Sequence, residues 1–289
     1  MVYKMILGVD VSKWQGLIDW NTCREAGAQY AFIRAGSCNA VSGVCYEDNL
    51  FKENSGYFED HQGAPALMPV GYYWYFRPQH NPMSQANYFC DLLDGADYLL
   101  PPVIDCENNG GLSPSAYADS IKTFLDRVEA RTGYKPIIYT SKSKWAEVEP
   151  RSYWPSYDLW VAHYTLNTEP LVPDGLTWTF WQYTSQGDAV TYGGPGPPSG
   201  DDDIDLNWFN GTEDEFLLYI GATPMIPERV VVSNPKNAIF WEKPGGLGKR
   251  LLIAPEGLCL AVMGVAEVDG KVWYDFGLGW LPSGTVEEL

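Results

Sequence analysis

Two acidic residues whose side chains can exchange protons lie two positions apart in Pro101-Pro-Val-Ile-Asp-Cys-Glu107. The apolar run before them predicts a strand, and alternation along a strand directs Asp105 and Glu107 to one face and Cys106 to the other. Like charges held this close resist simultaneous ionisation, so the pKa of one carboxyl group should rise and supply a general acid near neutral pH. Paired carboxyl groups carry out glycoside hydrolysis, and the pair therefore predicts that chemistry.

The elements that must position this pair follow a regular pattern. Short β-branched and aromatic runs recur up to about residue 210, with helix-like segments between several of them. The expected strands are 6–11, 30–34, 69–76, 102–105, 136–139, 159–163, 179–183 and 204–206. The expected helices are 18–26, 48–61, 84–93 and 115–131. This alternation predicts an α/β fold with a parallel sheet, an irregular (β/α) TIM-like barrel with little room for helices in its second half.

Closure of such a barrel would bring polar strand ends together at one mouth. Asp10 ends the first strand and Asp205 lies in the last, so both should approach Asp105 and Glu107. A lone Asp-x-Glu pair is as often a solvated pair on a loop, but the convergence of four acids weakens that alternative.

Aromatic residues gather at the same strand ends and favour a carbohydrate ligand, because sugar rings pack their C–H faces on aromatic surfaces. About half of these aromatic residues should instead be core, since a strand must bury one face. The candidate substrate-binding residues are Tyr75, Tyr139, Gln182, Trp160 and Arg34.

After residue 229 the pattern changes to short alternating runs separated by turns, with Asp269-Gly270 as a strong hairpin signal. Roughly 60 residues of this kind predict a small all-β barrel. We therefore expect a catalytic β/α barrel at 1–212, a linker at 213–228, and a small β-barrel at 229–289.

Five ordered segments resemble the motifs of glycoside hydrolase family 25, the Chalaropsis-type lysozymes. They are Asp10-Val-Ser-Lys-Trp-Gln-Gly16, Ile104-Asp-Cys-Glu107, Leu159-Trp-Val-Ala-His-Tyr164, Trp181-Gln-Tyr-Thr-Ser-Gln-Gly187 and Asp205-Leu-Asn-Trp-Phe-Asn-Gly211. The resemblance spans about residues 5–211. It implies an irregular β/α barrel that cleaves the β-1,4 bond after N-acetylmuramic acid in peptidoglycan.

The resemblance also implies residue roles. Glu107 matches the general acid/base, and Asp105, Asp10 and Asp205 match the carboxylates that orient the substrate and stabilise the transition state. Asp203 competes for the Asp205 role, although the motif spacing favours Asp205. Two retaining routes stay open, through a carboxylate nucleophile or through the 2-acetamido oxygen of the substrate, and Asp105 beside Glu107 suits the second.

The C-terminal segment, with Asp269-Gly-Lys-Val-Trp273-Tyr and Gly279-Trp280-Leu281, resembles bacterial Src-homology-3-like domains, which often bind cell walls. A packing appendage without a ligand is the alternative, because fold analogy alone does not establish function.

The composition narrows the range of partners. A net charge of −18 disfavours nucleic acid and anionic membrane surfaces, and no apolar stretch approaches the ~18 to 20 residues that span a bilayer. We expect peptidoglycan as substrate, a cell-wall ligand at the C-terminal domain, no nucleic-acid or membrane partner, no cofactor and no metal. The alternatives are a catalytically silent wall-binding lectin and, less favoured, a metal-dependent phosphoesterase.

The N-terminal residues give an expectation for where the protein is located. The N-terminus reaches Lys4 and a strand before a signal-peptide core can form, so the sequence shows no export signal. Together with the wall-directed two-domain organisation, this predicts a phage endolysin held in the host bacterial cytoplasm until its release to the cell wall. A clipped signal peptide would give the same sequence.

The six cysteines are scattered and predict mostly free thiols, although Cys38 and Cys45 share a loop and could pair if oxidised.

Overall fold

The computed structural model describes residues 5–59, 68–166, 168–221, 229–233, 238–262, 264–276 and 279–288. The chain divides into two compact units, Met5–Asn210 and Gly211–Leu289, and each has a hydrophobic core of its own. The end of the helix expected to reach His61 and the second part of the predicted linker, 222–228, lie outside the described residues.

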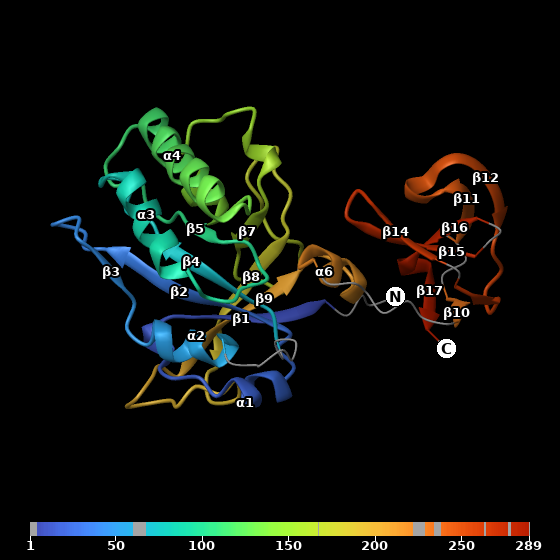
Figure 1. Ribbon diagram of the computed structural model, residues 1–289, viewed down its shortest axis with the longest axis horizontal. Coiled ribbons are helices and arrows are strands. Elements are labelled where there is room, and N and C mark those ends of the chain that lie inside the picture. Colours follow the sequence, from blue (N-terminus) through green and yellow to red (C-terminus); the bar gives the residue numbers. More distant parts are fainter. Residues whose placement is uncertain are drawn as a thin grey trace. The chain divides into compact units, whose positions relative to one another are not determined.

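Within the described residues, the larger unit is a closed barrel of eight strands (Figure 1). They are β1 (Ile6–Val11), β2 (Tyr30–Cys38), β4 (Val70–Tyr75), β5 (Val103–Asp105), β6 (Ile137–Thr140), β7 (Leu159–Ala162), β8 (Phe180–Asp188) and β9 (Asp203–Phe209). The hydrogen-bonded order is β1-β9-β8-β7-β6-β5-β4-β2, and a parallel β1–β2 pairing closes the sheet. The predicted α/β TIM-like barrel is confirmed.

The last barrel strand departs from the expected parallel sheet, which is wrong at this position. β9 runs antiparallel to both β8 and β1. A parallel crossover needs a dozen or more residues that usually form a helix, whereas the Gly- and Pro-rich segment 189–202 forms turns and returns the chain directly. The N-terminal part of β9 therefore lies at the mouth, with Asp205 directly opposite Asp10.

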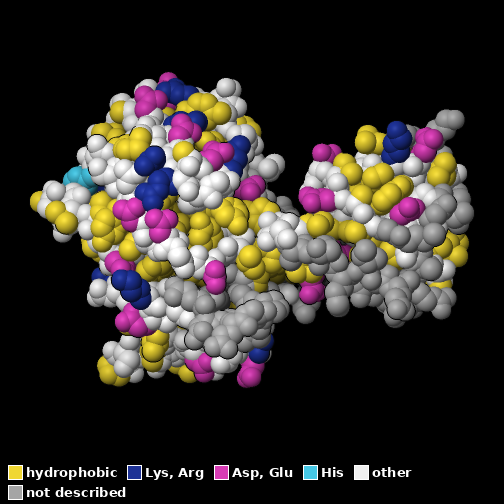
Figure 2. Space-filling view, in the orientation of Figure 1, with side chains coloured by type: hydrophobic (Ala, Val, Ile, Leu, Met, Phe, Trp, Pro, Cys, Tyr) yellow, Lys and Arg dark blue, Asp and Glu magenta, His cyan; other side chains and the backbone are white. Residues whose placement is uncertain are grey.

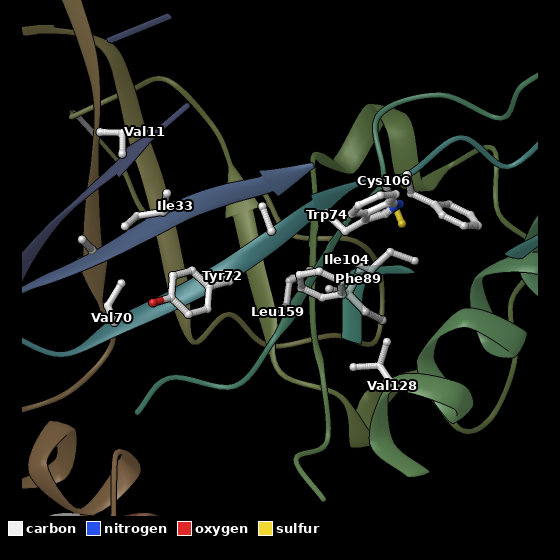
Figure 3. Packing of buried hydrophobic residues seen from close by; sticks show 14 of the residues in the cluster. Val11, Ile33, Val70, Tyr72, Trp74, Phe89, Ile104, Cys106, Val128 and Leu159 are labelled. Carbon is white, nitrogen blue, oxygen red and sulfur yellow. The ribbon is translucent and has the colours of Figure 1, made fainter. Parts of the chain in front are cut away.

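Helices cover the outside of the barrel. They are α1 (Trp20–Glu25), α2 (Phe51–Glu59), α3 (Pro82–Leu93), α4 (Pro114–Thr132) and α5 (Lys142–Trp145), with 3-10 turns η1 (Lys13–Gln15) and η2 (Trp154–Ser156). α3 and α4 lie side by side (Figure 1). Phe89 of α3 and Val128 of α4 pack into the cluster that contains Trp74 and Ile104 of the strands (Figure 3). No helix in the described residues is both long enough and apolar enough for a transmembrane span.

The helix ends follow their capping residues. The Ser113 hydroxyl accepts a hydrogen bond from the Ala116 N–H at 3.3 Å, and Pro114 occupies the first helical position. At the other end Gly133 adopts the left-handed conformation, with φ 76°, that ends helices. These residues fix both ends of the longest helix and with them the position of the β5–α4 connection.

The structure contains a disulfide at a pair of cysteines whose pairing the sequence left open. β2 continues beyond its expected end and turns back as β3 (Cys45–Glu47), a strand that the sequence analysis missed. Cys38 and Cys45 face each other in the β2–β3 ladder and are joined by a disulfide. Of the two alternatives left open for this pair, the structure shows the disulfide, because the hairpin register brings the two side chains together. The thiols of Cys23, Cys90, Cys106 and Cys259 are free.

The smaller unit consists mainly of short strands. Its elements are α6 (Glu213–Tyr219), β10 (Arg229–Val232), β11 (Ile239–Lys243), η3 (Pro244–Gly246), β12 (Leu247–Ile253), β13 (Cys259–Ala261), β14 (Gly264–Val268), β15 (Lys271–Asp275), β16 (Trp280–Pro282), η4 (Ser283–Thr285) and β17 (Val286–Glu288). The strands form two sheets, β13-β10-β17 and β12-β11-β16-β15-β14. Asp269 and Gly270 both have positive φ, and the predicted β14–β15 hairpin is confirmed.

The start of the predicted linker, 213–228, is the helix α6. The Tyr274 hydroxyl donates a hydrogen bond to the Asp214 carboxylate, and Leu218 packs against the core of the smaller unit. The structure therefore groups α6 with the small sheets.

Acidic and basic side chains are interspersed on the face of the larger unit that Figure 2 shows. The large negative net charge of −18 is thus not gathered into one patch on this face. At the mouth of the barrel, in contrast, acidic side chains are gathered in one cavity.

Candidate active site

Four carboxyl groups converge at the mouth of the barrel. A cavity of about 200 Å³ is lined by Asp10 of β1, Asp105 at the end of β5, Glu107 just beyond it, and Asp205 of β9. The same cavity is lined by the other residues singled out in the sequence, Tyr75, Tyr139, Gln182, Trp160 and Arg34. Asp203, the competitor of Asp205, is exposed and is not among the described lining residues.

Asp10 is buried in a bed of amide donors. Its Oδ2 accepts hydrogen bonds from Gln182 Nε2 at 2.9 Å and from Asn207 Nδ2 at 2.8 Å. Burial raises the pKa of Asp10 to about 6, although these two bonds and one with Asp205 act to lower it.

Asp205 shares a proton with Asp10. Burial, and after it the neighbouring charge of Asp10, raises the pKa of Asp205 to about 9. The two carboxyl groups are hydrogen-bonded and titrate as a pair. Near neutral pH the pair holds one proton, on Asp205, and one negative charge, on Asp10.

A surrounding layer of aromatic side chains orients the two amides. Tyr139 Oη donates to Gln182 Oε1 at 2.7 Å, and Tyr164 Oη donates to the same atom at 3.1 Å. Trp160 Nε1 donates to Asn207 Oδ1 at 2.8 Å. Because both amide oxygens are occupied, the NH₂ groups of Gln182 and Asn207 must face Asp10. Trp160 and Gln182 are only 1% and 2% exposed, so they belong to the floor of the cavity.

The Asp105–Glu107 pair has the predicted alternation. Both residues line the cavity, whereas Cys106 lies in the core outside the barrel (Figure 3). Burial, and then the charge of Glu107, raises the pKa of Asp105 well above its ordinary value, and Arg34 acts against this shift. Asp105 Oδ1 is buried without a hydrogen-bond partner among the described residues, which is rare for a polar atom in a folded protein.

Glu107 is half-buried, and its burial raises the pKa of its carboxyl group. The charge of Lys144, a hydrogen bond from Tyr75, and the charges of Arg77 and Arg34 all act to lower that pKa. The Arg77 guanidinium lies over the Tyr75 ring, 4.5 Å from its centroid. The position of Tyr75 beside Glu107 is thereby fixed.

Arg34 is held in place by a buried acid that the sequence analysis did not assign to the site. Its Nε and one terminal nitrogen each donate to Asp48 at 2.9 Å, in a bidentate pair. Asp48 also accepts the Lys13 backbone N–H at 3.0 Å. Asp48 therefore ties the cavity wall to the turn that follows β1.

A second cavity, of about 550 Å³, shares Glu107 and Tyr139 with the first. Its other lining residues are Ser141, Lys142, Ser143, Lys144, Ala162, His163, Tyr164 and Leu171. Glu107 thus lies where the two cavities adjoin. The sequence analysis missed Lys144 and the roles of Asn207 and Tyr164, although the last two lie within quoted motifs.

The described residues contain no group of three or more His, Cys, Asp or Glu side chains that could hold a metal ion. The arrangement instead offers carboxyl groups in two protonation states, a floor of hydrogen-bonded amides, and aromatic walls. These are the components of acid–base chemistry on a saccharide.

Comparison with known proteins gives consistent matches over the barrel. The sequence profile described as Glycosyl hydrolases family 25 matches residues 9–191. Lysozyme M1 of Streptomyces globisporus is 34% identical over 236 residues, which cover 75% of this chain and 72% of that protein. The uncharacterized protein YegX of Escherichia coli K12 is 32% identical over 229 residues, 77% of this chain and 76% of YegX. The crystal structure of the bacterial lysozyme from Streptomyces coelicolor superposes with a TM-score of 0.58 at 30% identity, covering 75% of this chain and 97% of that one.

Proposed function

Since the chain belongs to glycosyl hydrolase family 25, and so to the glycoside hydrolases of the lysozyme type, we propose that it cleaves the β-1,4 bond between N-acetylmuramic acid and N-acetylglucosamine in peptidoglycan. The observation that carries the proposal is the convergence of Asp10, Asp105, Glu107 and Asp205 on one cavity. A single acid pair would fit many hydrolases, but four acids on an amide floor fit a cationic sugar-like transition state.

Glu107 is the general acid and base of the proposed reaction. It lies where the cavities adjoin, and burial raises the pKa of its carboxyl group, which favours retention of the proton that a general acid needs. It donates that proton to the glycosidic oxygen as the bond to the anomeric carbon breaks. The resulting carboxylate then takes a proton from the water that attacks in the second step.

Asp105 supports the route through the substrate's 2-acetamido group. In that route the acetamido oxygen attacks the anomeric carbon and an oxazolinium ion forms, which water then opens. The Asp105 carboxylate, which lines the cavity, accepts the acetamido N–H, and this bond favours negative charge on Asp105 and leaves the proton on Glu107. Asp10, with its single negative charge, stabilises the positive charge that develops on the sugar.

The remaining candidate residues divide by exposure. Tyr75 and Arg34 are partly exposed in the cavity wall and suit direct contact with substrate. Tyr139, Trp160 and Gln182 are buried and hold the floor on which the substrate rests.

The proposal extends to the biological setting. A wall-degrading barrel followed by a separate small β unit fits a phage endolysin whose second unit, Src-homology-3-like, binds a cell-wall ligand. We place the protein in the host bacterial cytoplasm until it is released to act on the wall. The second unit has a hydrophobic core of its own, as a separately folding domain requires.

The test uses purified peptidoglycan, with and without EDTA, and mass spectrometry of every new reducing end. The wild-type chain is compared with Glu107→Gln and Asp105→Asn, and circular dichroism checks that each variant is folded. New N-acetylmuramic acid ends that resist EDTA and disappear in both variants are expected.

Three outcomes would contradict the proposal. Wall binding without new ends would indicate a lectin, and EDTA-sensitive hydrolysis would indicate a metal enzyme. An active and folded Glu107→Gln variant would remove Glu107 from its assigned role.

A further inference from the structure

The two cavities at the barrel mouth carry opposite charge. The first is lined by four aspartates, Asp10, Asp105, Asp201 and Asp205, besides Glu107, against a single cation among the described lining residues, Arg34. The second is lined by two lysines and two serines, and among the described residues Glu107 is its one carboxyl group. In a chain with a net charge of −18, a cation-lined cavity beside the general acid points to an anionic part of the ligand.

The two lysines are available to a ligand. Lys142 Nζ lies 2.9 Å from Asp174 Oδ1, but the two side chains are 48% and 97% exposed. An exposed pair of this kind contributes roughly 1 kcal/mol or less, so a ligand carboxylate can replace Asp174. Lys144 is exposed and forms no ion pair in the part of the chain that the structure describes. The short helix α5 carries both lysines, and the Ser141 hydroxyl caps it by accepting the Lys144 N–H at 3.3 Å.

Exposed apolar side chains line the same cavity. Tyr164 and Leu171 are 59% and 56% exposed, and both belong to the cavity wall. The hydrogen bond from Tyr164 Oη to Gln182 holds the ring in place. The second cavity therefore offers cations together with small apolar surfaces, which suits a short peptide with carboxylates and methyl side chains better than it suits a sugar alone.

The proposed reaction determines on which side of Glu107 such a peptide would lie. The sugar whose anomeric carbon reacts must lie beside Asp105 in the first cavity, so the leaving saccharide lies across Glu107, toward the second cavity. In peptidoglycan the saccharide after the leaving N-acetylglucosamine is again an N-acetylmuramic acid, whose lactyl group bears the peptide stem. The second cavity has more than twice the volume of the first, about 550 against 200 Å³.

We propose that Lys142 and Lys144 bind the free carboxylates of a peptide stem on the leaving-group side, so that the enzyme prefers peptide-bearing peptidoglycan to bare glycan. This inference rests on the proposed muramidase function and assigns it a substrate class. The stem's position also explains why α5 presents its lysines beside the general acid.

The experiment compares three soluble tetrasaccharides of alternating N-acetylglucosamine and N-acetylmuramic acid. The first bears peptide stems, the second bears stems whose carboxylates are capped as methylamides, and the third has no peptide. With the full-length enzyme we expect kcat/KM to be roughly three- to tenfold higher on the first than on the other two, as for one or two partly exposed ion pairs.

The variants separate a peptide site from an effect on Glu107. Lys142→Gln/Lys144→Gln should make the three kcat/KM values equal, and Lys144→Arg should keep the preference. Lys52→Gln is the matched control, because Lys52 is also an exposed lysine with a carboxylate, Glu47, at 2.9 Å, and it lines neither cavity. The ratio between substrates is the readout, since Lys144 also acts on the pKa of Glu107 and so changes turnover of all three substrates.

A readout without turnover keeps this inference distinct from the proposed function. Calorimetric titration of the Glu107→Gln chain with the three tetrasaccharides should show tighter binding of the first, and the added lysine substitutions should abolish the difference. Equal kcat/KM on all three substrates, or a preference that survives in the double lysine variant, would overturn the inference. If no substrate is cleaved, the muramidase proposal fails, and stem-dependent binding still decides whether the lysine site exists.

Discussion

Asp205 carries a proton near neutral pH, and a protonated carboxyl group has nearly the shape and charge of an amide. Asp205→Asn should therefore keep kcat/KM within roughly tenfold of the wild type. Asp10→Asn keeps an oxygen that can accept from Gln182 and Asn207 but removes the negative charge, so it should lose about a hundredfold or more. Steady-state kinetics on peptidoglycan fragments measures both, and equal losses would show that Asp205 acts as a carboxylate.

The same pair predicts how stability depends on pH. Both folded pKa values, about 6 and about 9, lie above the ordinary value of 3.8. From about pH 4 to about pH 9, the native state therefore holds more protons than the unfolded state. The free energy of unfolding should therefore fall as pH rises from about 4 to about 9. Asp205→Asn removes the group with the higher pKa, and with it the fall in the free energy of unfolding at the alkaline end of this range. Urea unfolding at pH 5 to 9.5 should show its stability gain over wild type growing with pH, and a constant difference would refute the shared proton.

Lys144 predicts a shift in the pH–rate profile. Its charge lowers the pKa of Glu107, whose protonated form is the proposed general acid. Lys144→Gln should raise that pKa and move the basic limb of kcat/KM to higher pH on every substrate, including bare glycan. The Lys52→Gln profile should match the wild type. A basic limb that does not move would mean that another group controls it.

The sequence shows the charged residues of the site more readily than their supports. Asp10, Asp105 and Glu107 end or follow strands, and this placement is legible from the apolar runs before them. Asp48 and Lys144 have no such signal. Their roles depend on long-range packing of a hairpin and of the short helix α5, which no local period in the sequence encodes.

At the scale of elements, the disulfide hairpin β2–β3 makes a stability prediction. Joining Cys38 to Cys45 closes a short loop, and its removal should lower the free energy of unfolding by roughly 2 kcal/mol. The double variant Cys38→Ser/Cys45→Ser should show this loss in urea unfolding, and Cys259→Ser, an exposed free thiol, should not. A reducing agent should shift the wild type and leave the double variant unchanged. No shift in either protein would show that the bond contributes nothing.

Most strands of the barrel could be predicted, because each is a short apolar run between turn residues. The direction of β9 could not be, since direction depends on the connection and not on the strand's own residues. The Gly- and Pro-rich segment 189–202, which forms turns and no helix, was the available signal that β9 returns antiparallel. β3 was missed for a related reason: its three residues are mostly exposed or half-exposed and show no apolar run.

For the whole molecule, separate hydrophobic cores predict separate unfolding. Differential scanning calorimetry should resolve two transitions, one for each unit. Phe124→Ala, in the barrel core, should lower the midpoint temperature of one transition, and Phe240→Ala, in the small core, should lower that of the other. Each substitution should reduce the free energy of unfolding of its unit by about 3 to 5 kcal/mol. A single transition that responds to both substitutions would show that the two units unfold together.

The hydrogen bond between Asp10 and Asn207 joins residues 197 positions apart, from the first and last strands of the barrel. A ribosome that has translated Asp105 and Glu107 has therefore made the reacting groups but not the site that controls them. We therefore expect hydrolytic activity to begin only when β9 has emerged and closed the ring against β1. During synthesis this closure sets an intrinsic delay, and any product that ends before residue 203 should lack activity on peptidoglycan.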